Sequence, residues 1–368
     1  MRCKTIIFRI GFSLRNFATS AVKDFESIYL RLSACICGCP LACYKLQLAE
    51  TMLRRHHAAM QAANDPSMEL TQAYQHCLDI ARSHYENFPT ASKLLRADLR
   101  PAVAAIYAFA RHADDLADEG DAAAETRLKQ LDAWETLLER CEHDGSINHP
   151  IFMALADAIQ RRGLDIEELD NLLIAFRMDV TIHAYASLDE LLFYCKHSAN
   201  PVGRLLLQLH GIRHADAIYC SDKICSALQL INFWQDLSID LPRGRCYLPE
   251  AWLQEVGLSG AQLLDGAIDN AAIRPVLERA IDETLAMLEA GAPLLAMIPF
   301  RLRLQIAATL HGGRLMLNKI AGLEQPLKQR ATLGKADWRG LILPVLGASL
   351  FPPRASRARA GSKETELS

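Results

Sequence analysis

The chain has 368 residues, of which 51% are hydrophobic and 23% are charged, and its formal net charge is −3 at pH 7. This length allows one large domain or two modest ones, and the apolar content allows a sizeable core. The small net charge gives no general attraction to nucleic acid, so a nucleic-acid partner is not expected. No run reaches the roughly 18 to 20 apolar residues that span a bilayer.

The first 60 residues differ from the rest, with nine Lys and Arg against three Asp and Glu. They also hold five of the eleven cysteines, but the spacing from Cys35 to Cys43 matches no zinc pattern. A basic, acid-poor start resembles a transit peptide. A start codon set upstream of true initiation near Met60 or Met68 explains the composition too, and we favour that interpretation.

Three regions are therefore predicted. Residues 1–66 form an N-terminal extension outside any domain, residues 67–350 form a single domain, and residues 351–368 form a basic, then polar, disordered tail.

From about residue 68 the hydrophobic pattern is helical, and strand signals are missing. Pro101 suits a first helical turn, and Gly120 follows the end of the same segment. The fold class predicted is all-α. We predict helices at 69–84, 101–118, 123–142, 150–161, 166–182, 187–209, 214–240, 271–296, 300–321 and 335–346. A kink is expected at Asn200, where Pro201 follows.

Polar residues follow one face of the segment 101–118. Tyr107, Arg111, Asp114 and Asp118 are spaced three or four residues apart, so they share a face at 3.6 residues per turn. Two carboxylates one turn apart on an otherwise apolar helix repel each other and resist burial, so a counter-charge is required.

A second face of this kind occurs in the segment 214–240. Gln229, Asn232, Asp236 and Asp240 have the same spacing, and the Pro-Arg-Gly sequence ending at Gly244 closes the helix. Hard cations with oxygen ligands compensate such carboxylates, and Mg²⁺ usually brings substrate phosphates with it. Two acidic faces looking at each other across an apolar cavity therefore predict a Mg²⁺–diphosphate site.

Other cofactor chemistries lack their signatures. The chain contains neither G-x-G-x-x-G nor G-x-x-x-x-G-K-[ST], so a nucleotide-binding loop is not predicted. A Glu-x-x-His pair of the kind that di-iron bundles use is also missing.

Together these motifs resemble those of the squalene/phytoene synthase family over roughly residues 70–350. The two spaced motifs look like the family's first and second aspartate motifs, Arg245-Cys-Tyr247-Leu-Pro249 resembles its Arg-x-Tyr-x-Pro turn, and Tyr194 to Gly203 resembles its kinked helix. The resemblance implies an isoprenoid (terpenoid) synthase helical bundle around a central cavity.

The resemblance also implies roles for individual residues. The expected Mg²⁺ ligands are Asp114, Asp118, Asp236 and Asp240. The expected substrate-binding residues are His84, Arg111, Gln229, Asn232 and Arg245. The expected catalytic residues are Tyr107, Arg111, Asn232 and Tyr247. Asp115 and Glu119 are expected to point away from the site.

Within the family, the chain looks like the hydroxysqualene synthases of bacterial hopanoid pathways, notably in His84 to Phe88, Ser198 to Gly203 and Asn232 to Asp236. This implies a carbon–oxygen lyase that converts presqualene diphosphate and water to hydroxysqualene and diphosphate with Mg²⁺, a step toward squalene and hopanoids. Head-to-head synthases typically have His-Ser-x-Ser-Phe and an Arg before the second-motif aspartate.

Here Glu86 and Gln235 stand in those two regions, which lowers the positive charge available to a second diphosphate. We therefore expect Gln235→Arg with Glu86→Lys to improve binding of farnesyl diphosphate.

Two alternatives stay open. One is a head-to-head squalene or phytoene synthase acting on two allylic diphosphates, and the other is a non-catalytic family member acting as an assembly factor. The expected partners are a presqualene diphosphate synthase and a squalene-forming dehydrogenase. We expect a cytoplasmic protein that is peripheral at the inner face of the membrane. Residues 341–351 offer an apolar contact for lipid, although a buried last helix is the expectation we favour.

Overall fold

A computed structural model describes residues 66–83, 95–143 and 147–353. The expectations for His84, for Glu86, for nearly all of the N-terminal extension and for most of the tail lie outside the described residues. The chain divides into two compact units, Met1–Ile166 and Glu167–Ser368. The extent of the predicted domain, 67–350, stays a prediction.

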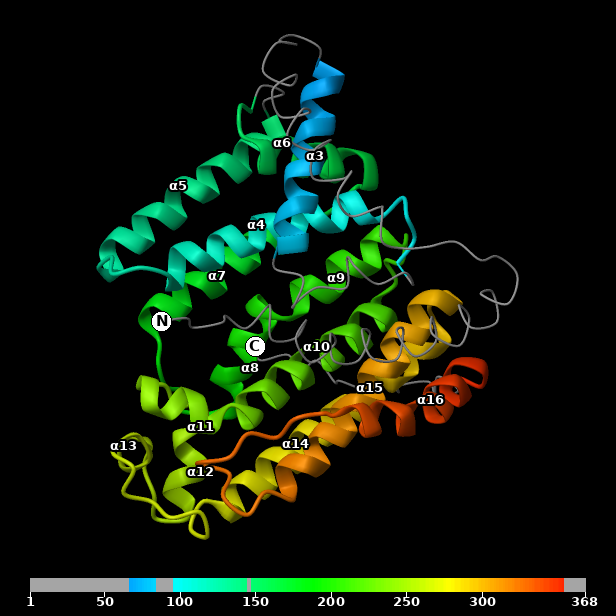
Figure 1. Ribbon diagram of the computed structural model, residues 1–368. Coiled ribbons are helices and arrows are strands. Elements are labelled where there is room, and N and C mark those ends of the chain that lie inside the picture. The colour runs from blue at the N-terminus through cyan, green and yellow to red at the C-terminus, as the bar shows by residue number, and fades with distance from the viewer. Residues whose placement is uncertain (1–65, 84–94, 144–146, 354–368) are drawn as a thin grey trace, which may run out of the picture. The chain divides into compact units, whose positions relative to one another are not determined.

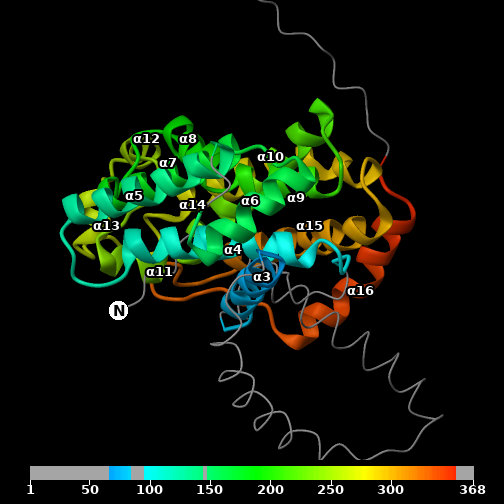
Figure 2. The same cartoon turned by 90° about the horizontal axis from the view of Figure 1, so that it is seen from above.

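The first unit contains four helices among its described residues: α3 (Pro66–Ser83), α4 (Arg100–Asp118), α5 (Ala124–His143) and α6 (Pro150–Arg162). Helix α4 packs against the other three, and α3 also packs against α6 (Figures 1 and 2). Phe109 of α4 lies 6.0 Å from the ring of Trp134 and 5.9 Å from that of Phe152. These fully or nearly fully buried rings hold α4 in place, because aromatic pairs at this separation pack favourably.

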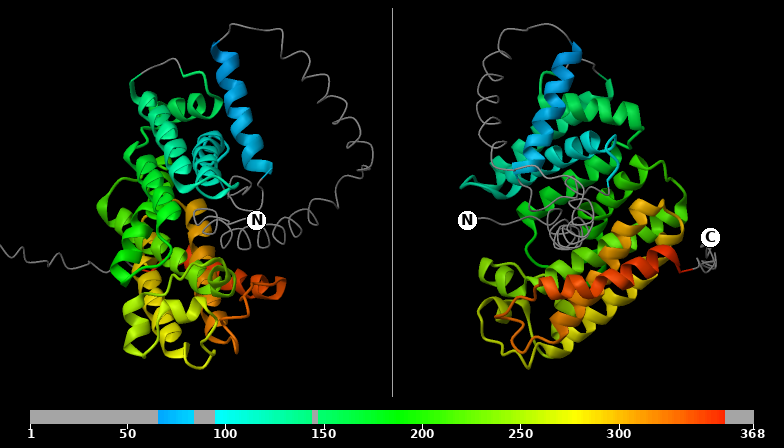
Figure 3. Two further views of the ribbon diagram at one scale, coloured as in Figure 1. Left: turned by 90° about the vertical axis from the view of Figure 1, so that its left-hand side faces the viewer. Right: turned by 45° about the vertical axis from the view of Figure 1, so that its right-hand side comes forward.

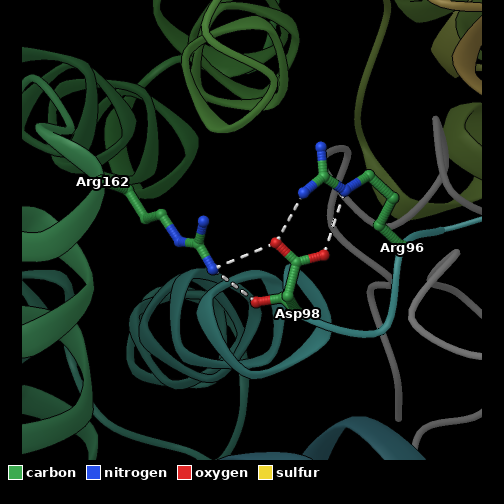
Figure 4. Close-up of polar contacts among 3 residues, drawn as sticks. All are labelled: Arg96, Asp98 and Arg162. Atoms are coloured by element: carbon green, nitrogen blue, oxygen red, sulfur yellow. Dashed lines mark hydrogen bonds and ion pairs between the residues drawn. The ribbon is translucent and has the colours of Figure 1, made fainter.

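Asp98 ties the start of α4 to the end of α6 (Figure 4). Arg96 donates two hydrogen bonds to its carboxylate, both 3.0 Å long. Arg162 donates to the Asp98 backbone carbonyl at 2.7 Å. The hydrogen bonds from Arg96 lower the pKa of the Asp98 carboxyl. Because this cluster is exposed to solvent, it orients α4 more than it stabilises the fold.

The second unit begins with α7 and is built around α10. Its helices are α7 (Glu167–Thr181), α8 (Leu188–Ser198), α9 (Asn200–Leu209), α10 (Ala215–Gln235), α11 (Leu237–Asp240), α12 (Glu250–Glu255), α13 (Gly260–Leu264), α14 (Arg274–Gly291), α15 (Phe300–Ala321) and α16 (Lys335–Leu350). Two 3₁₀ segments, η2 (Leu241–Arg243) and η3 (Ala292–Ala296), complete it.

Helix α10 is the core of this unit. Every residue from 224 to 235 is buried, and α8, α9, α14 and α15 pack around the helix (Figure 1). Close approach depends on glycine: a Cβ added to Gly203 of α9 would lie 2.5 Å from Cys225 Sγ and 2.5 Å from Ser221 Oγ. Such distances are too short for real carbon atoms, so glycine at 203 allows α9 to lie against α10.

The all-α prediction is confirmed: the described residues contain no strand, only an isolated bridge between Ala184 and Cys246. The predicted segment 187–209 is two helices that meet at Ala199, next to the expected kink. The predicted segment 214–240 is also interrupted, since α10 ends at Gln235 and Asp236 separates it from α11. Two short helices, α12 and α13, were not predicted, because six and five residues are too few to show a helical hydrophobic period.

The last helix corrects an expectation. Helix α16 runs beside α15 (Figure 3), but Leu343 is 78% exposed, Leu350 59% and Phe351 82%. The favoured expectation of a buried last helix is therefore wrong. In the part of the chain that is described, no helix has both the length and the apolarity to cross a membrane.

Candidate diphosphate and metal site

The first motif lies on α4, and part of it is buried together with the apolar residues of that helix. Tyr107 and Asp114 are each 1% exposed. Burial raises the pKa of Tyr107, and the charges of Asp114 and Asp115 add to the rise while Arg111 opposes it. The hydroxyl of Tyr107 is therefore protonated at neutral pH and lies within electrostatic reach of these three groups.

Arg111 is the centre of the charges on α4. It lies 3.4 Å from Asp114 and 2.9 Å from Glu119, and it also pairs with Asp115. Asp115 and Glu119 were expected to point away from the site, but the structure brings both onto Arg111. Because Asp115 is about one-third exposed and Glu119 nearly half exposed, these pairs are weaker than buried ones, and an incoming anion competes for Arg111 with two partly hydrated carboxylates.

The second motif crosses the junction between α10 and α11 and keeps its spacing. Gln229 is 0% exposed, and Asn232, Asp236 and Asp240 are each 2% exposed. The Asp236 N–H donates to the Asn232 carbonyl at 3.0 Å, and the Asp240 N–H donates to the Asp236 carbonyl at 2.9 Å. These bonds carry the helical repeat across the junction, so the four side chains share one face.

The two amide side chains of this motif are unsatisfied. Among the described residues, Gln229 Oε1 and Nε2 and Asn232 Nδ2 have no hydrogen-bond partner. Leaving a buried polar group without a partner costs about 1–3 kcal/mol. Native proteins rarely retain such groups unless a water or ligand satisfies them. The predicted role of Gln229 and Asn232 in binding a polar ligand stays a prediction that this arrangement suits.

Sequence reasoning missed Arg330, which pairs with Asp236. Arg330 lies in the loop between α15 and α16, and Asp236 is almost fully buried. The neighbouring Ala331 carbonyl accepts a 2.7 Å hydrogen bond from Gln235 Nε2. No spacing rule connects residues so far apart in sequence, and a lone Arg in a polar loop carries no periodic signal, so only the fold reveals this pair.

Arg245 and Tyr247 follow a tight turn. Gly244 has φ = +76°, a conformation that favours glycine, and the Arg245 N–H donates to the Asp240 carbonyl at 3.1 Å. The Tyr247 ring stacks on Phe233 at 3.8 Å. The turn therefore holds Arg245 next to Asp240 along the backbone and buries Tyr247 against α10.

Two further residues, Tyr185 and Tyr194, complete an aromatic cluster in the second unit. Tyr185 lies 6.2 Å from Tyr247 and 5.8 Å from Tyr194, and Tyr194 lies 6.1 Å from Phe233. The Tyr194 hydroxyl donates to both carboxylate oxygens of Asp179, at 3.0 and 3.2 Å. Burial, and then the charge of Asp179, raises the pKa of both Tyr185 and Tyr194. Asp179 and Tyr185 carried no distinct signal in the sequence.

The acidic residues suit a hard cation. In the first unit Asp114 offers nearly fully buried carboxylate oxygens, and in the second unit Asp236 and Asp240 do so. In the described ranges, no group of three or more His, Cys, Asp and Glu forms a metal-binding cluster. Mg²⁺ needs no such cluster, because one or two carboxylates plus water and substrate phosphates satisfy it. The residues present fit Mg²⁺, which stays a prediction.

A family model described as Squalene/phytoene synthase matches residues 81–337, which include both aspartate motifs. The chain belongs to the squalene/phytoene synthase family. The predicted resemblance is confirmed.

Relatives within the family carry different names. A hydroxysqualene synthase from Sinorhizobium fredii is 33% identical over 266 residues, which cover 72% of this chain and 87% of that protein. Chloroplastic phytoene synthase 3 from Zea mays is 32% identical over 235 residues, which cover 60% of this chain and 54% of that protein.

The fold agrees with that of a solved relative. The crystal structure of the squalene synthase HpnC from Alicyclobacillus acidocaldarius matches with a TM-score of 0.63 at 35% identity, covering 68% of this chain and 94% of that one. The helical fold of the terpenoid synthases is therefore confirmed. The family membership supports an enzyme of isoprenoid biosynthesis that acts on isoprenoid diphosphates.

Proposed function

We propose that this enzyme converts presqualene diphosphate and water to hydroxysqualene and diphosphate. The observation that carries the proposal is the second-motif face, where two buried, unsatisfied amides stand beside two buried carboxylates. An apolar site with fixed polar groups of this kind suits a diphosphate attached to a long hydrocarbon. The similarity to a hydroxysqualene synthase over 72% of the chain supports this member of the family's reactions.

The arginines and amides bind the leaving group. Arg111 and Arg245 would hold diphosphate oxygens, and the Nε2 of Gln229 and the Nδ2 of Asn232 would donate to them. Asp114, Asp118, Asp236 and Asp240 would hold Mg²⁺, which, when bound, neutralises the charge of the departing diphosphate. His84 stays a predicted substrate-binding residue.

The aromatic cluster suits the cation left behind. The stacked rings of Tyr247 and Phe233 present π-electron density that stabilises a positive charge. Because Tyr107 stays protonated at neutral pH, its hydroxyl can donate to an anion on the α4 face. Burial of these rings excludes bulk water, so the cation survives until a chosen nucleophile reaches it.

A head-to-head synthase is the second candidate, and the similarity to a phytoene synthase favours it. The charge argument against it is weaker in the folded chain than in the sequence. The neutral amide of Gln235 supplies no positive charge and donates a hydrogen bond to the Ala331 carbonyl. Arg330, however, brings a positive charge to Asp236. The assembly-factor alternative has in its favour only the basic composition of residues 1–60, and both carboxylate motifs are intact in the sequence.

The partners follow from the chemistry. A presqualene diphosphate synthase would supply the substrate, and a squalene-forming dehydrogenase would consume the product on the way to hopanoids. Since both molecules carry a thirty-carbon hydrocarbon chain, we infer peripheral contact with a cytoplasmic membrane surface through α16. Its exposed Leu343, Leu350 and Phe351 are apolar. Arg339 is exposed on the same helix. The sequence continues with Arg354, Arg357 and Arg359, and it has no Asp or Glu from 338 to 363. Apolar and basic residues together suit a surface of anionic lipid.

Diphosphate release from presqualene diphosphate tests the proposal. The full chain should release diphosphate with Mg²⁺ and lose this activity with excess EDTA. Asp236→Asn should reduce the rate of diphosphate release by about 100-fold or more, because the buried negative charge that would bind Mg²⁺ is lost. Asp265→Asn, at an exposed position after α13, is the matched control and should keep full activity. Equal activity of Asp236→Asn and the wild type would contradict the proposal.

A further inference from the structure

Ser198 places a buried hydroxyl near the break between α8 and α9. It is the last residue of α8, it is 1% exposed, and its Oγ has no hydrogen-bond partner among the described residues. Serines in helices commonly bond back to a carbonyl one turn earlier. Ser198 does not, so its desolvated hydroxyl costs about 1–3 kcal/mol unless a bound molecule satisfies it.

Two contacts place Ser198 at the level of Gln229. Tyr194, one turn before Ser198 on α8, lies 6.1 Å from Phe233, one turn after Gln229 on α10. Beyond the break, Asn200 Oδ1 accepts a 2.9 Å hydrogen bond from Ser226 Oγ, just before Gln229. Helices α8 and α9 both pack against α10. The two contacts lie on either side of Ser198 along the chain and on either side of Gln229 along α10, so the helical register puts Ser198 opposite Gln229.

Ser198 and Gln229 are both buried and have fully buried aromatic rings beside them. Tyr194 and Phe233 are fully buried on one side, and Gly203 lets α9 lie close to α10 on the other. Ser198 Oγ and Gln229 Oε1 are two unsatisfied acceptors in this setting. A buried water needs two to four polar partners, and such a pair provides the minimum.

We propose that Ser198 Oγ and Gln229 Oε1 hold the water molecule that becomes the hydroxyl group of the product. This inference rests on the proposed function. A water that donates both hydrogens to these acceptors turns its lone pairs toward the apolar side, where the cation forms. The carbon–oxygen bond of presqualene diphosphate breaks, and its electron pair leaves with diphosphate. The water oxygen then bonds to the rearranged cation, and the proton that it loses passes to the released diphosphate.

The partition of products tests this role. Ser198→Ala removes the acceptor with little change in volume, and presqualene diphosphate is supplied to the full-length enzyme with Mg²⁺. We expect diphosphate release within about twofold of wild type but a ratio of hydroxysqualene to dehydrated hydrocarbons lower by about tenfold, the equivalent of one lost hydrogen bond. Ser198→Thr keeps a hydroxyl and should restore much of the ratio.

Ser221→Ala is the matched control, because Ser221 is also buried but lies two turns before Gln229 on α10. It should leave the ratio unchanged. A Ser198→Ala enzyme with an unchanged ratio would overturn the inference, as would one in which only the total rate falls. A wild-type enzyme that releases diphosphate without forming hydroxysqualene would instead contradict the proposed function itself.

Discussion

Arg330, in the loop before α16, forms an ion pair with Asp236, a buried carboxylate of the second motif. The pair supplies the counter-charge that the sequence pattern assigned to Mg²⁺ alone. A loop far away in sequence therefore places a positive charge beside this buried carboxylate. The adjacent hydrogen bond from Gln235 to the Ala331 carbonyl fixes the loop in place.

Removing this cation should destabilise the protein in a way that metal reverses. Arg330→Gln removes a positive charge from beside the buried Asp236. We expect a loss of about 1–3 kcal/mol, less than for a fully buried pair because Arg330 is 27% exposed. Added Mg²⁺ should recover part of the loss, since it supplies the missing charge. Thermal denaturation with and without Mg²⁺ measures both effects. Lys129→Gln, which removes one partner of an exposed ion pair, is the control. If Mg²⁺ raises the Tm of Arg330→Gln by no more than it raises the Tm of wild type, the account is contradicted.

The same loop changes the expectation for Gln235. An arginine at 235 would break the hydrogen bond to Ala331 and bury a second cation near Arg330. We therefore expect Gln235→Arg to lower the free energy of unfolding by roughly 1–3 kcal/mol. The variant should then unfold at a lower temperature than wild type. A stable Gln235→Arg variant that binds farnesyl diphosphate more tightly would restore the original charge argument.

Sequence reasoning predicted the features that depend on local periodicity. The helices and the aspartate faces follow from 3.6-residue spacing, and the break near Asn200 follows from its proline neighbour. The roles of Arg330, Asp179 and Ser198 could not be predicted this way, because each depends on which distant side chain packs opposite. The exposed α16 was missed for a related reason, since an apolar helix is usually buried and composition alone does not identify its neighbours.

A single methyl group added between α14 and α10 should destabilise the protein. A Cβ at Gly291 would lie 2.7 Å from the backbone carbonyl of Cys220, which cannot move aside as a side-chain tip can. We expect Gly291→Ala to lose about 2–3 kcal/mol by overpacking. In Gly340→Ala the new methyl meets nothing within 4 Å, so stability should stay equal or rise by up to about 1 kcal/mol. Urea unfolding compares the two, and equal midpoints would show that the α10–α14 contact is looser than described.

Buried thiols should make the fold sensitive to alkali. Burial raises the pKa of Cys77 and Cys225 to about 12 and that of Cys246 to about 11. In the unfolded chain the pKa of these thiols is near its ordinary value of 9.0. The stability they contribute is therefore complete below about pH 9 and is lost as pH rises toward about 11 to 12. The Tm should fall over this range, and the fall should be shallower in Cys225→Ala with Cys246→Ala; identical slopes would contradict the assignment.

The exposed face of α16 should bind lipid. The full chain should sediment with vesicles that contain phosphatidylglycerol, and less with pure phosphatidylcholine, because basic residues flank the apolar helix. Leu343→Glu with Phe351→Glu should reduce sedimentation by about tenfold. Tyr219→Ser removes a comparably exposed ring on α10 and serves as the control. If the two variants sediment alike, the membrane contact lies elsewhere or does not form.

The most direct measurement is the product formed in ¹⁸O-labelled water. The full-length protein is incubated with Mg²⁺ and either presqualene diphosphate or farnesyl diphosphate. The products and their ¹⁸O content are identified by mass spectrometry. The account predicts hydroxysqualene carrying one ¹⁸O atom from presqualene diphosphate, and no thirty-carbon product from farnesyl diphosphate. Squalene, phytoene or presqualene diphosphate made from allylic diphosphates, or a hydroxysqualene without the label, would contradict it.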